Sequence, residues 1–207
     1  MRIGIIGSGN IGATLAERLV GAGHDVVLAN SRGPETLAPL VQRLGGGASA
    51  ATAEDAAAAG DMVIVSIPFG RYAQLPAAPL AGKVVVDSNN YYPSRDGRWP
   101  ALDADETTSS ELLAAHLPGA RVVKAFNTVY WEHLRDHARP AGAADRLALP
   151  IVGDDADAKA TVGALIDQVG YDAVDMGALG EGRRQQPDAE LYGAELTTEE
   201  LRGHLDG

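Results

Sequence analysis

Three glycines near the start of the chain constrain the fold more than any other feature. Gly7, Gly9 and Gly12 form a G-x-G-x-x-G string that directly follows the apolar run Arg2–Ile6 and opens a helical pattern. The string alone is weak evidence, but strand, glycine turn and helix in this order are typical of a dinucleotide-binding unit. The first glycine allows the tight turn, the second lets the backbone approach a pyrophosphate, and the third lets helix pack on strand. A glycine turn without a ligand is the alternative interpretation.

Short β-branched runs alternate with helical patterns along the chain, which predicts parallel strands joined by right-handed crossovers. The runs expected to form strands are residues 2–6, 25–29, a short run near 48, 62–67, 83–86, 121–125, 147–152 and 171–174. The patterns expected to form helices are residues 11–21, about 34–44 with Pro34 in the first turn, an alanine-rich stretch capped by Thr52, 108–116, a stretch through Trp131 and Leu134, 156–169 and 196–205. Thr108 with Glu111, and Thr197 with Glu200, fit capping boxes that open two of these helices.

The sequence therefore predicts an α/β protein: an NAD(P)-binding Rossmann fold with a doubly wound, mostly parallel sheet and a short C-terminal α/β extension. With 207 residues, we expect a single domain over residues 1–207, with a core over about 1–128 and an extension over about 129–207. The polar segment 87–107 is expected to be a loop, and loops of that length are more often functional than decorative.

Charge and composition exclude several classes of function. The formal net charge of −11 comes from scattered Asp and Glu and argues against nucleic acid or an anionic membrane as a partner. The chain has no Cys, which excludes disulfides, thiolate catalysis, iron–sulfur clusters and zinc–thiolate sites. The apolar run at residues 3–6 is too short for a signal sequence or a membrane span, so we expect a cytoplasmic protein.

The end of the second expected strand indicates which dinucleotide binds. NAD sites usually place an Asp or Glu there, to accept a hydrogen bond from the ribose 2′-hydroxyl. This chain instead has Asn30, Ser31 and Arg32. A carboxylate would repel a 2′-phosphate, whereas a hydroxyl and a guanidinium bind it, so NADP(H) is preferred over NAD(H). The alternative is that Arg32 is only a solvated turn residue.

The remaining candidate cofactor-binding residues follow the glycine turn and the later strands. Backbone amides of the first helical turn point toward the phosphates, and the ends of the fourth, fifth and sixth expected strands converge on the nicotinamide. The complete candidate set is Gly7, Ser8, Gly9, Asn10, Ile11, Gly12, Asn30, Ser31, Arg32, Ser66, Ile67, Pro68, Phe69, Asn89, Ala125, Phe126 and Asn127. The aromatic members have an alternative role as core residues.

These motifs together resemble the family of coenzyme F420-dependent NADP oxidoreductases and, more distantly, the NADPH-binding domain of the STEAP metalloreductases. The matching stretches span nearly the whole chain: residues 7–12, 30–32, 67–68, 86–87 with the Asn that follows, and 123–127. The resemblance implies that Ser31 and Arg32 hold the 2′-phosphate. It also implies that residues 67–69 and 125–127 border the nicotinamide. The stretch at 124–127 is closer to the STEAP-like branch than to the archaeal enzymes.

The resemblance implies an NADPH-dependent reductase that passes hydride to a deazaflavin (F420) or flavin-type acceptor and forms a homodimer. Two redox cofactors need only be stacked and shielded from water, so no acid–base pair is expected. Alternatives within the same class are a flavin, a ferric chelate or a small carbonyl as acceptor. A third hypothesis is a non-catalytic module that senses the NADPH/NADP ratio. A hydroxyacid dehydrogenase would need a larger second domain.

Four further polar groups have more than one interpretation. His133 and His137 share a helical face, but no carboxylate or Cys completes a metal set, so solvated or interface histidines are favoured and no metal is expected. Lys124 is at least as well explained by a salt bridge as by catalysis. The Arg183–Arg184 pair either holds an anionic acceptor tail or is a solvated basic turn.

Overall fold

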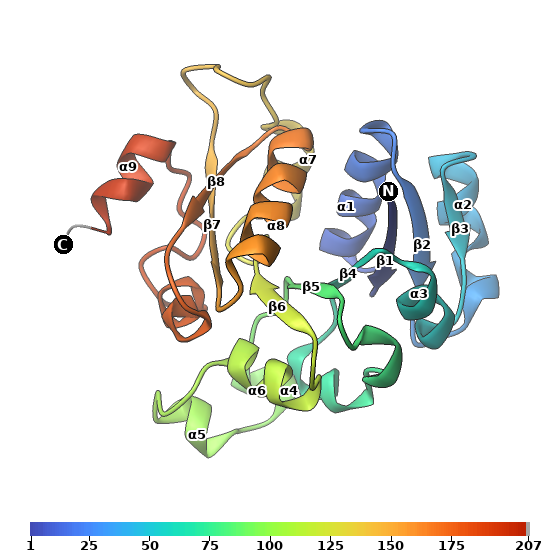
Figure 1. Cartoon of the computed structure of the whole chain (residues 1–207), viewed down its shortest axis with the longest axis horizontal. Coiled ribbons are helices and arrows are strands. Elements are labelled where there is room, and N and C mark those ends of the chain that lie inside the picture. The colour runs from blue at the N-terminus through green and yellow to red at the C-terminus, as the bar shows by residue number, and fades with distance from the viewer. Residues whose placement is uncertain (206–207) are drawn as a thin grey trace.

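A computed structural model describes residues 1–205, and its centre is an eight-stranded sheet in the order β3-β2-β1-β4-β5-β6-β7-β8 (Figure 1). The strands are β1 (Arg2–Ile6), β2 (Asp25–Ala29), β3 (Ala48–Ala50), β4 (Met62–Val65), β5 (Val84–Asp87), β6 (Arg121–Lys124), β7 (Ala148–Gly153) and β8 (Asp172–Asp175). Strands β1 to β6 pair in parallel, β7 runs antiparallel to β6, and β8 is parallel to β7. The predicted mostly parallel Rossmann fold is confirmed.

Helices and helical turns connect the strands. The α-helices are α1 (Asn10–Gly21), α2 (Ala38–Leu44), α3 (Ala53–Ala59), α4 (Pro93–Asp96), α5 (Pro100–Asp103), α6 (Ser109–His116), α7 (Trp131–Asp136), α8 (Ala156–Gln168) and α9 (Thr198–Gly203). The 3-10 turns are η1 (Pro34–Leu37), η2 (Phe69–Gln74), η3 (Ala78–Leu80) and η4 (Leu179–Gln185). Both predicted capping boxes are present, at Thr108 with Glu111 and at Thr197 with Glu200. Within residues 1–205, no helix combines the length and apolar character that crossing a bilayer requires.

The sheet reverses its strand order beside β1, and this reversal locates the ligand crevice. The chain moves from β1 outward to β2 and β3, then returns to β4 on the other side of β1. In open α/β sheets, ligands bind outside the carboxyl ends of the strands at such a point. The carboxyl ends of β1, β2 and β4 carry the glycine turn, Asn30–Arg32 and Ser66–Pro68.

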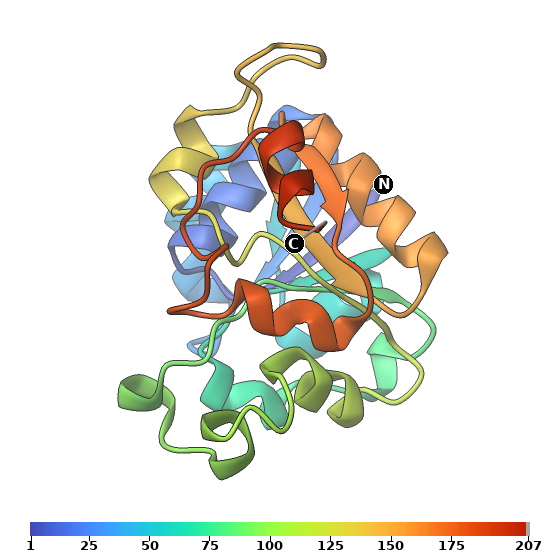
Figure 2. The same ribbon diagram turned by 90° about the vertical axis from the view of Figure 1, so that its left-hand side faces the viewer.

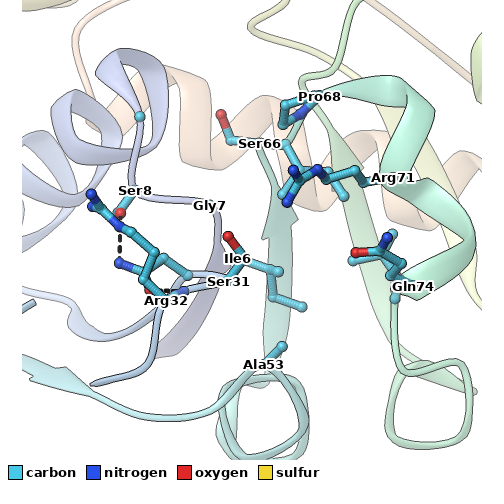
Figure 3. A pocket seen from close by; sticks show the side chains of 14 residues that line it. Ile6, Gly7, Ser8, Ser31, Arg32, Ala53, Ser66, Pro68, Arg71 and Gln74 are labelled. Carbon is cyan, nitrogen blue, oxygen red and sulfur yellow. Dashed lines mark hydrogen bonds between the residues drawn. The ribbon is translucent and has the colours of Figure 1, made fainter. Parts of the chain in front are cut away.

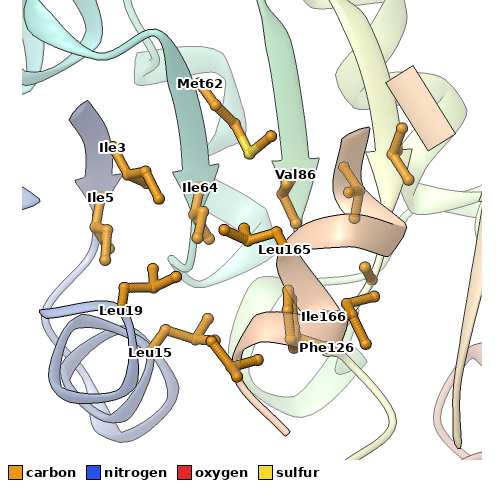
Figure 4. Close-up of a cluster of buried hydrophobic side chains, with 14 of the residues drawn as sticks. Ile3, Ile5, Leu15, Leu19, Met62, Ile64, Val86, Phe126, Leu165 and Ile166 are labelled. Atoms are coloured by element: carbon orange, nitrogen blue, oxygen red, sulfur yellow. The ribbon is translucent and has the colours of Figure 1, made fainter. Parts of the chain in front are cut away.

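Two apolar layers hold the helices against the sheet, because alternate strand residues face opposite sides. On one side, Ile3 and Ile5 of β1, Ile64 of β4 and Val86 of β5 pack against Leu15 and Leu19 of α1 and Leu165 and Ile166 of α8 (Figure 4). On the other side, Val63, Val65 and Val85 pack in a second cluster with residues of α3 and α6. Figure 2 looks onto the β8 end of the molecule, where the C-terminal segment with α9 covers the edge of the sheet.

Three predicted boundaries are wrong, each for a local reason. The expected loop 87–107 contains α4 and α5, because Pro93 and Pro100 each occupy a first-turn position that a proline favours. The last helix begins at Thr198 rather than 196, because Leu196 and Thr197 are extended beside β7 and the Leu196 carbonyl accepts from the Ala148 N–H. Strand β4 ends at Val65, two residues before the predicted end at Ile67.

Candidate functional site

The glycine turn between β1 and α1 leaves space for a ligand at only one of its three glycines. Gly7 has φ +116°, and a Cβ there would lie 1.9 Å from the Ser66 carbonyl oxygen. A Cβ on Gly12 would lie 2.0 Å from the Gly7 carbonyl oxygen. A Cβ on Gly9 would meet no protein atom within 4 Å, and no side chain caps the start of α1. The helix N-terminus therefore faces open space with free backbone N–H groups, as a pyrophosphate requires.

A first cavity of about 400 Å³ opens from the glycine turn toward β2 (Figure 3). Its lining residues are Ile6, Gly7, Ser8, Gly9, Asn30, Ser31, Arg32, Ala53, Ser66, Ile67, Pro68, Arg71, Gln74 and Leu75. This set contains two arginines and no carboxylate, so the local field is positive although the whole chain carries a net charge of −11. The cavity therefore suits an anionic group.

Asn30 fixes the turn that presents Ser31 and Arg32. Its Oδ1 accepts from the Arg32 N–H at 2.8 Å, and its Nδ2 donates to Thr36 Oγ1 at 2.9 Å and to Ser8 Oγ at 3.3 Å. Asn30 thus ties the end of β2 to the glycine turn. The Ser31 and Arg32 side chains are exposed and free to bind a ligand in the cavity.

A second cavity of about 390 Å³ continues from the first, and the two share Gly9, Ser66, Ile67 and Pro68. Its other lining residues are Asn10, Ile11, Ser88, Asn89, Asn90, Tyr92, Arg95, Phe126, Asn127, Val129, Tyr130, Trp131 and Tyr192. The Tyr92 and Tyr192 hydroxyls share a hydrogen bond. Burial and the Tyr92 hydroxyl raise the pKa of Tyr192, so its phenol stays protonated near neutral pH. The second cavity thus combines several aromatic side chains with one guanidinium, that of Arg95, which is paired with Asp96.

Two amide side chains that line the second cavity have buried polar atoms without a hydrogen-bond partner in residues 1–205. Asn89 Oδ1 accepts from the Ile67 N–H at 2.7 Å, which leaves Asn89 Nδ2 as an orphaned donor. Asn127 Nδ2 donates to Asn90 Oδ1 at 3.1 Å and to the Gln185 carbonyl at 2.7 Å, which leaves Asn127 Oδ1 as an orphaned acceptor. A carboxamide carries the complementary acceptor and donor.

Lys124 forms a buried ion pair behind the second cavity. Its side chain is 0% exposed, and its Nζ lies 3.7 Å from Asp87 Oδ2 and donates to the Asn89 carbonyl at 3.0 Å and to Ser110 Oγ at 3.1 Å. Burial lowers the pKa of Lys124, and the charge of Asp87 partly opposes that shift. This geometry agrees with the salt-bridge interpretation of Lys124. The ammonium group also fixes the backbone of Asn89 by donating to its carbonyl.

Most of the sequence-predicted residues come together at these two cavities, but three do not line either one. Phe69 is 1% exposed and packs its ring against Tyr72, Tyr91 and Trp99, so its side chain belongs to the core and does not border the nicotinamide space. Ala125 directly follows β6 and is fully buried in the same apolar cluster as Leu15 and Leu165. Gly12 lies against the Gly7 backbone, as its packing task requires.

The basic turn agrees with the solvated interpretation, whereas the histidine pair differs from the sequence expectation. Arg184 is paired with Glu190 and donates to the His204 carbonyl, and neither Arg183 nor Arg184 lines a cavity named above. The reason for excluding a metal at His133 and His137 is wrong. The fold brings the carboxylate of Glu195, distant in sequence, against both imidazoles.

Sequence reasoning missed the residues that reach the cavities from the connecting segments. Arg71 and Gln74 come from η2, Tyr92 and Arg95 come from the segment expected to be a loop, and Tyr192 comes from the C-terminal extension. The pair Tyr91–Tyr92 within a polar segment was the available signal for the loop residues. No local pattern distinguishes Arg71 or Tyr192, because only the tertiary fold brings them to the site.

Comparison with known proteins places this geometry among reductases. Residues 2–91 match the family model described as NADP oxidoreductase, coenzyme F420-dependent. The metalloreductase STEAP3 of Rattus norvegicus is 34% identical over 186 residues, which cover 88% of this chain and 35% of the relative. The chain thus spans about a third of the length of the curated relatives it matches.

Two solved structures cover nearly the whole chain. A hypothetical protein from Sinorhizobium meliloti is 34% identical with a TM-score of 0.80, covering 96% of this chain and 95% of that one. A proposed F420-dependent NADP reductase from Arthrobacter sp. is 29% identical with a TM-score of 0.75, covering 88% of this chain and 87% of that one. The likeness therefore includes the C-terminal extension as well as the glycine turn.

Proposed function

We propose that this chain is an NADP-dependent oxidoreductase similar to the coenzyme F420-dependent NADP oxidoreductases, whose family model matches residues 2–91. We propose that it transfers hydride between NADP(H), whose phosphates lie in the first cavity and whose nicotinamide reaches the second, and a deazaflavin (F420) or flavin-type acceptor in the second cavity. The observation that carries the proposal is the wall that both cavities share at Gly9 and Ser66–Pro68. A nicotinamide beside that wall would lie next to an acceptor ring.

The first cavity supplies the binding energy and the orientation of the dinucleotide. The free N–H groups at the start of α1 bind the pyrophosphate, and Gly9 leaves the backbone close enough for them to do so. Ser31 and Arg32 bind the 2′-phosphate, and Arg71 adds a second guanidinium to the same cavity. Two cations and no carboxylate favour NADP(H) over NAD(H).

The second cavity orients the reacting rings and keeps water away from them. Bound NADPH supplies the hydride. Asn89 and Asn127 hold the carboxamide through their orphaned donor and acceptor, while Ile67 and Pro68 restrict the face on which the ring lies. Tyr130, Trp131 and Tyr192 provide apolar ring surface for a flat acceptor, and Arg95 provides a cation for an anionic substituent.

The acid–base chemistry of the site agrees with transfer between two cofactors. Lys124 lies fully buried in its pair with Asp87, so it positions Asn89 rather than donating a proton to a substrate. Positioning the two rings within about 3–3.5 Å is the main contribution that such a site has to make.

A second candidate acceptor is a ferric chelate, which the 34% identity with a metalloreductase favours. Stopped-flow mixing of the protein and NADPH with F420, FMN, FAD or ferric chelate in separate experiments tests the choice. Rapid NADPH oxidation with F420 or a flavin supports the proposal, and oxidation with ferric chelate alone selects the second candidate. Tight NADPH binding without turnover on any acceptor would contradict both and favour a sensor.

The domain organisation, location and assembly are also proposals. The continuity of the sheet from β3 to β8 supports one domain with a core over about residues 1–128 and an extension from about 129. The homodimer rests on the family resemblance, and the cytoplasmic location rests on the short apolar run at residues 3–6. Light scattering of the purified chain measures its mass, and a mass of 21.4 kDa would contradict the dimer.

A further inference from the structure

Outside the two cavities, the fold gathers two imidazoles and a carboxylate from distant parts of the chain. His133 and His137 lie one helical turn apart at the end of α7, where the His137 N–H donates to the His133 carbonyl at 2.8 Å. Glu195 reaches them from the C-terminal extension. The ligand atoms of the three side chains lie within 4.8 Å of one another, and in residues 1–205 this is the one group of three with that property.

The backbone holds these three positions together without help from the side chains themselves. The Gly193 N–H donates to the Thr128 carbonyl at 2.8 Å, and the Ala148 N–H donates to the Leu196 carbonyl at 2.8 Å. These bonds fix the segment that carries Glu195 on both of its sides. The Tyr171 hydroxyl donates to the His133 carbonyl at 2.6 Å and so attaches α7 to the segment that precedes β8. The group is therefore preorganised.

Both imidazoles place their Nδ1 atoms near the same carboxylate oxygen. The two imidazoles stack with centroids 4.5 Å apart and planes 10° apart, and the Nδ1 atoms of both face Oε1 of Glu195. His133 Nδ1 is buried and is in direct contact with Glu195 Oε1. A cation bound to both atoms would replace this direct contact.

We propose that His133, His137 and Glu195 form a site for a divalent first-row transition-metal ion, with Zn²⁺ as its natural occupant. Two imidazole nitrogens and one carboxylate oxygen are a ligand set that Zn²⁺ takes, with water at the fourth position. The side chains are 37% to 39% exposed, so the fourth position opens to solvent. No sulfur ligand is involved.

The ion would brace the wall of the second cavity. Tyr130 precedes α7 and stacks edge-on against His133, and it also contacts Tyr192, which lines the second cavity three residues before Glu195. Metal ligation would therefore fix the C-terminal extension against α7 at the point where both reach the acceptor space. This is a structural role, because none of the three ligands lines either cavity.

The test is titration of the chelator-treated full chain with Zn²⁺ by calorimetry, and with Co²⁺ by visible absorption. We expect one ion per chain, a tetrahedral Co²⁺ spectrum and a rise in melting temperature on metal addition. His137→Gln and Glu195→Gln should each weaken binding at least about 10-fold. His204→Gln removes a comparably exposed histidine that faces Glu190, and it should leave binding unchanged.

Unchanged NADPH affinity in the two ligand variants would show that they remain folded, since neither residue lines the first cavity. Three outcomes would overturn the proposal: no Zn²⁺ binding by the parent chain, weak binding of several ions without saturation, or stoichiometric binding that survives both ligand substitutions. In the first case, the three side chains are only an ion pair.

Discussion

Arg71 lies across the first cavity from Arg32, and the two guanidinium groups border the same space from opposite walls (Figure 3). Arg32 follows β2 and Arg71 belongs to η2 after β4, so the two sides of the strand-order reversal each contribute a cation. The preference for a phosphorylated dinucleotide therefore depends on the tertiary fold as well as on the Ser31–Arg32 turn.

Replacing Arg32 should remove most of the discrimination between the two dinucleotides. A hydrogen bond to a charged group contributes about 1.5–3 kcal/mol, so Arg32→Ala should weaken NADPH binding about 10- to 150-fold. NADH binding should change little, because NADH has no 2′-phosphate. Calorimetry with both dinucleotides measures the two affinities. Arg98→Ala, which removes an exposed arginine paired with Asp103 outside both cavities, is the control.

Alanine at two of the glycines should separate folding from binding. Gly7→Ala should lower the free energy of unfolding by more than about 2 kcal/mol, because its φ of +116° and the Ser66 carbonyl both oppose a Cβ. Gly9→Ala should cost about 1 kcal/mol or less, yet weaken NADPH binding at least about 10-fold. Urea unfolding and calorimetry measure the two effects. Equal affinity for NADPH in Gly9→Ala and the parent would contradict the pyrophosphate position.

The buried pair of Lys124 and Asp87 should be far more costly to break than to replace. Lys124→Met leaves the Asp87 carboxylate buried without its cation, and we expect a loss of about 3–5 kcal/mol. Lys124→Met combined with Asp87→Asn should recover most of that stability. A double variant as unstable as the single one would show that Lys124 acts through its hydrogen bonds to Asn89 and Ser110 instead.

Acid should weaken the start of α6 through Glu111. Burial alone would raise the pKa of Glu111, but hydrogen bonds from the Thr108 N–H and the Thr107 hydroxyl lower it overall. Because the folded-state pKa is the lower one, this stabilisation is present above the unfolded-state pKa and is lost as the pH falls through the folded-state pKa. Urea unfolding of Glu111→Gln at a series of acidic pH values should show a shallower decline than the parent. Parallel declines would contradict the assignment.

Arg95 should affect the acceptor and not the dinucleotide. Arg95 lines the second cavity and not the first, its guanidinium is paired with Asp96, and it lies over the Tyr92 ring at 4.8 Å. Arg95→Ala should raise the KM for an anionic acceptor about 10-fold while the NADPH affinity stays the same, because one charge-assisted contact is lost. Steady-state kinetics with F420 and with an uncharged flavin analogue measure the effect. A matched rise for both acceptors would show that Arg95 only supports the loop.

The sequence predicted what local patterns encode. The glycine turn, the Asn30–Arg32 turn and both capping boxes depend on residues only a few positions apart, and the structure contains each of them. Contacts between segments that are far apart in the sequence could not be predicted from such local patterns. Glu195 beside His133 and Tyr192 beside Tyr92 depend on how the extension returns along β7.

Aromatic residues show the same limit. Phe69 follows a strand end as a cofactor-contacting residue would, but burial among Tyr72, Tyr91 and Trp99 is available to it because α4 and α5 fold over η2. The apolar ring packs there instead of at the cavity, since removing it from water stabilises the fold. Neither its spacing nor its type distinguishes the two positions.

Direct hydride transfer between the two rings is tested most directly with NADPH that carries deuterium at the transferred position of C4. The protein, labelled NADPH and oxidised F420 are mixed, and the reduced deazaflavin is analysed by mass spectrometry. Our account predicts that the reduced deazaflavin retains the deuterium. Reduction with hydrogen from solvent only, or no reduction while NADPH is bound, would contradict it.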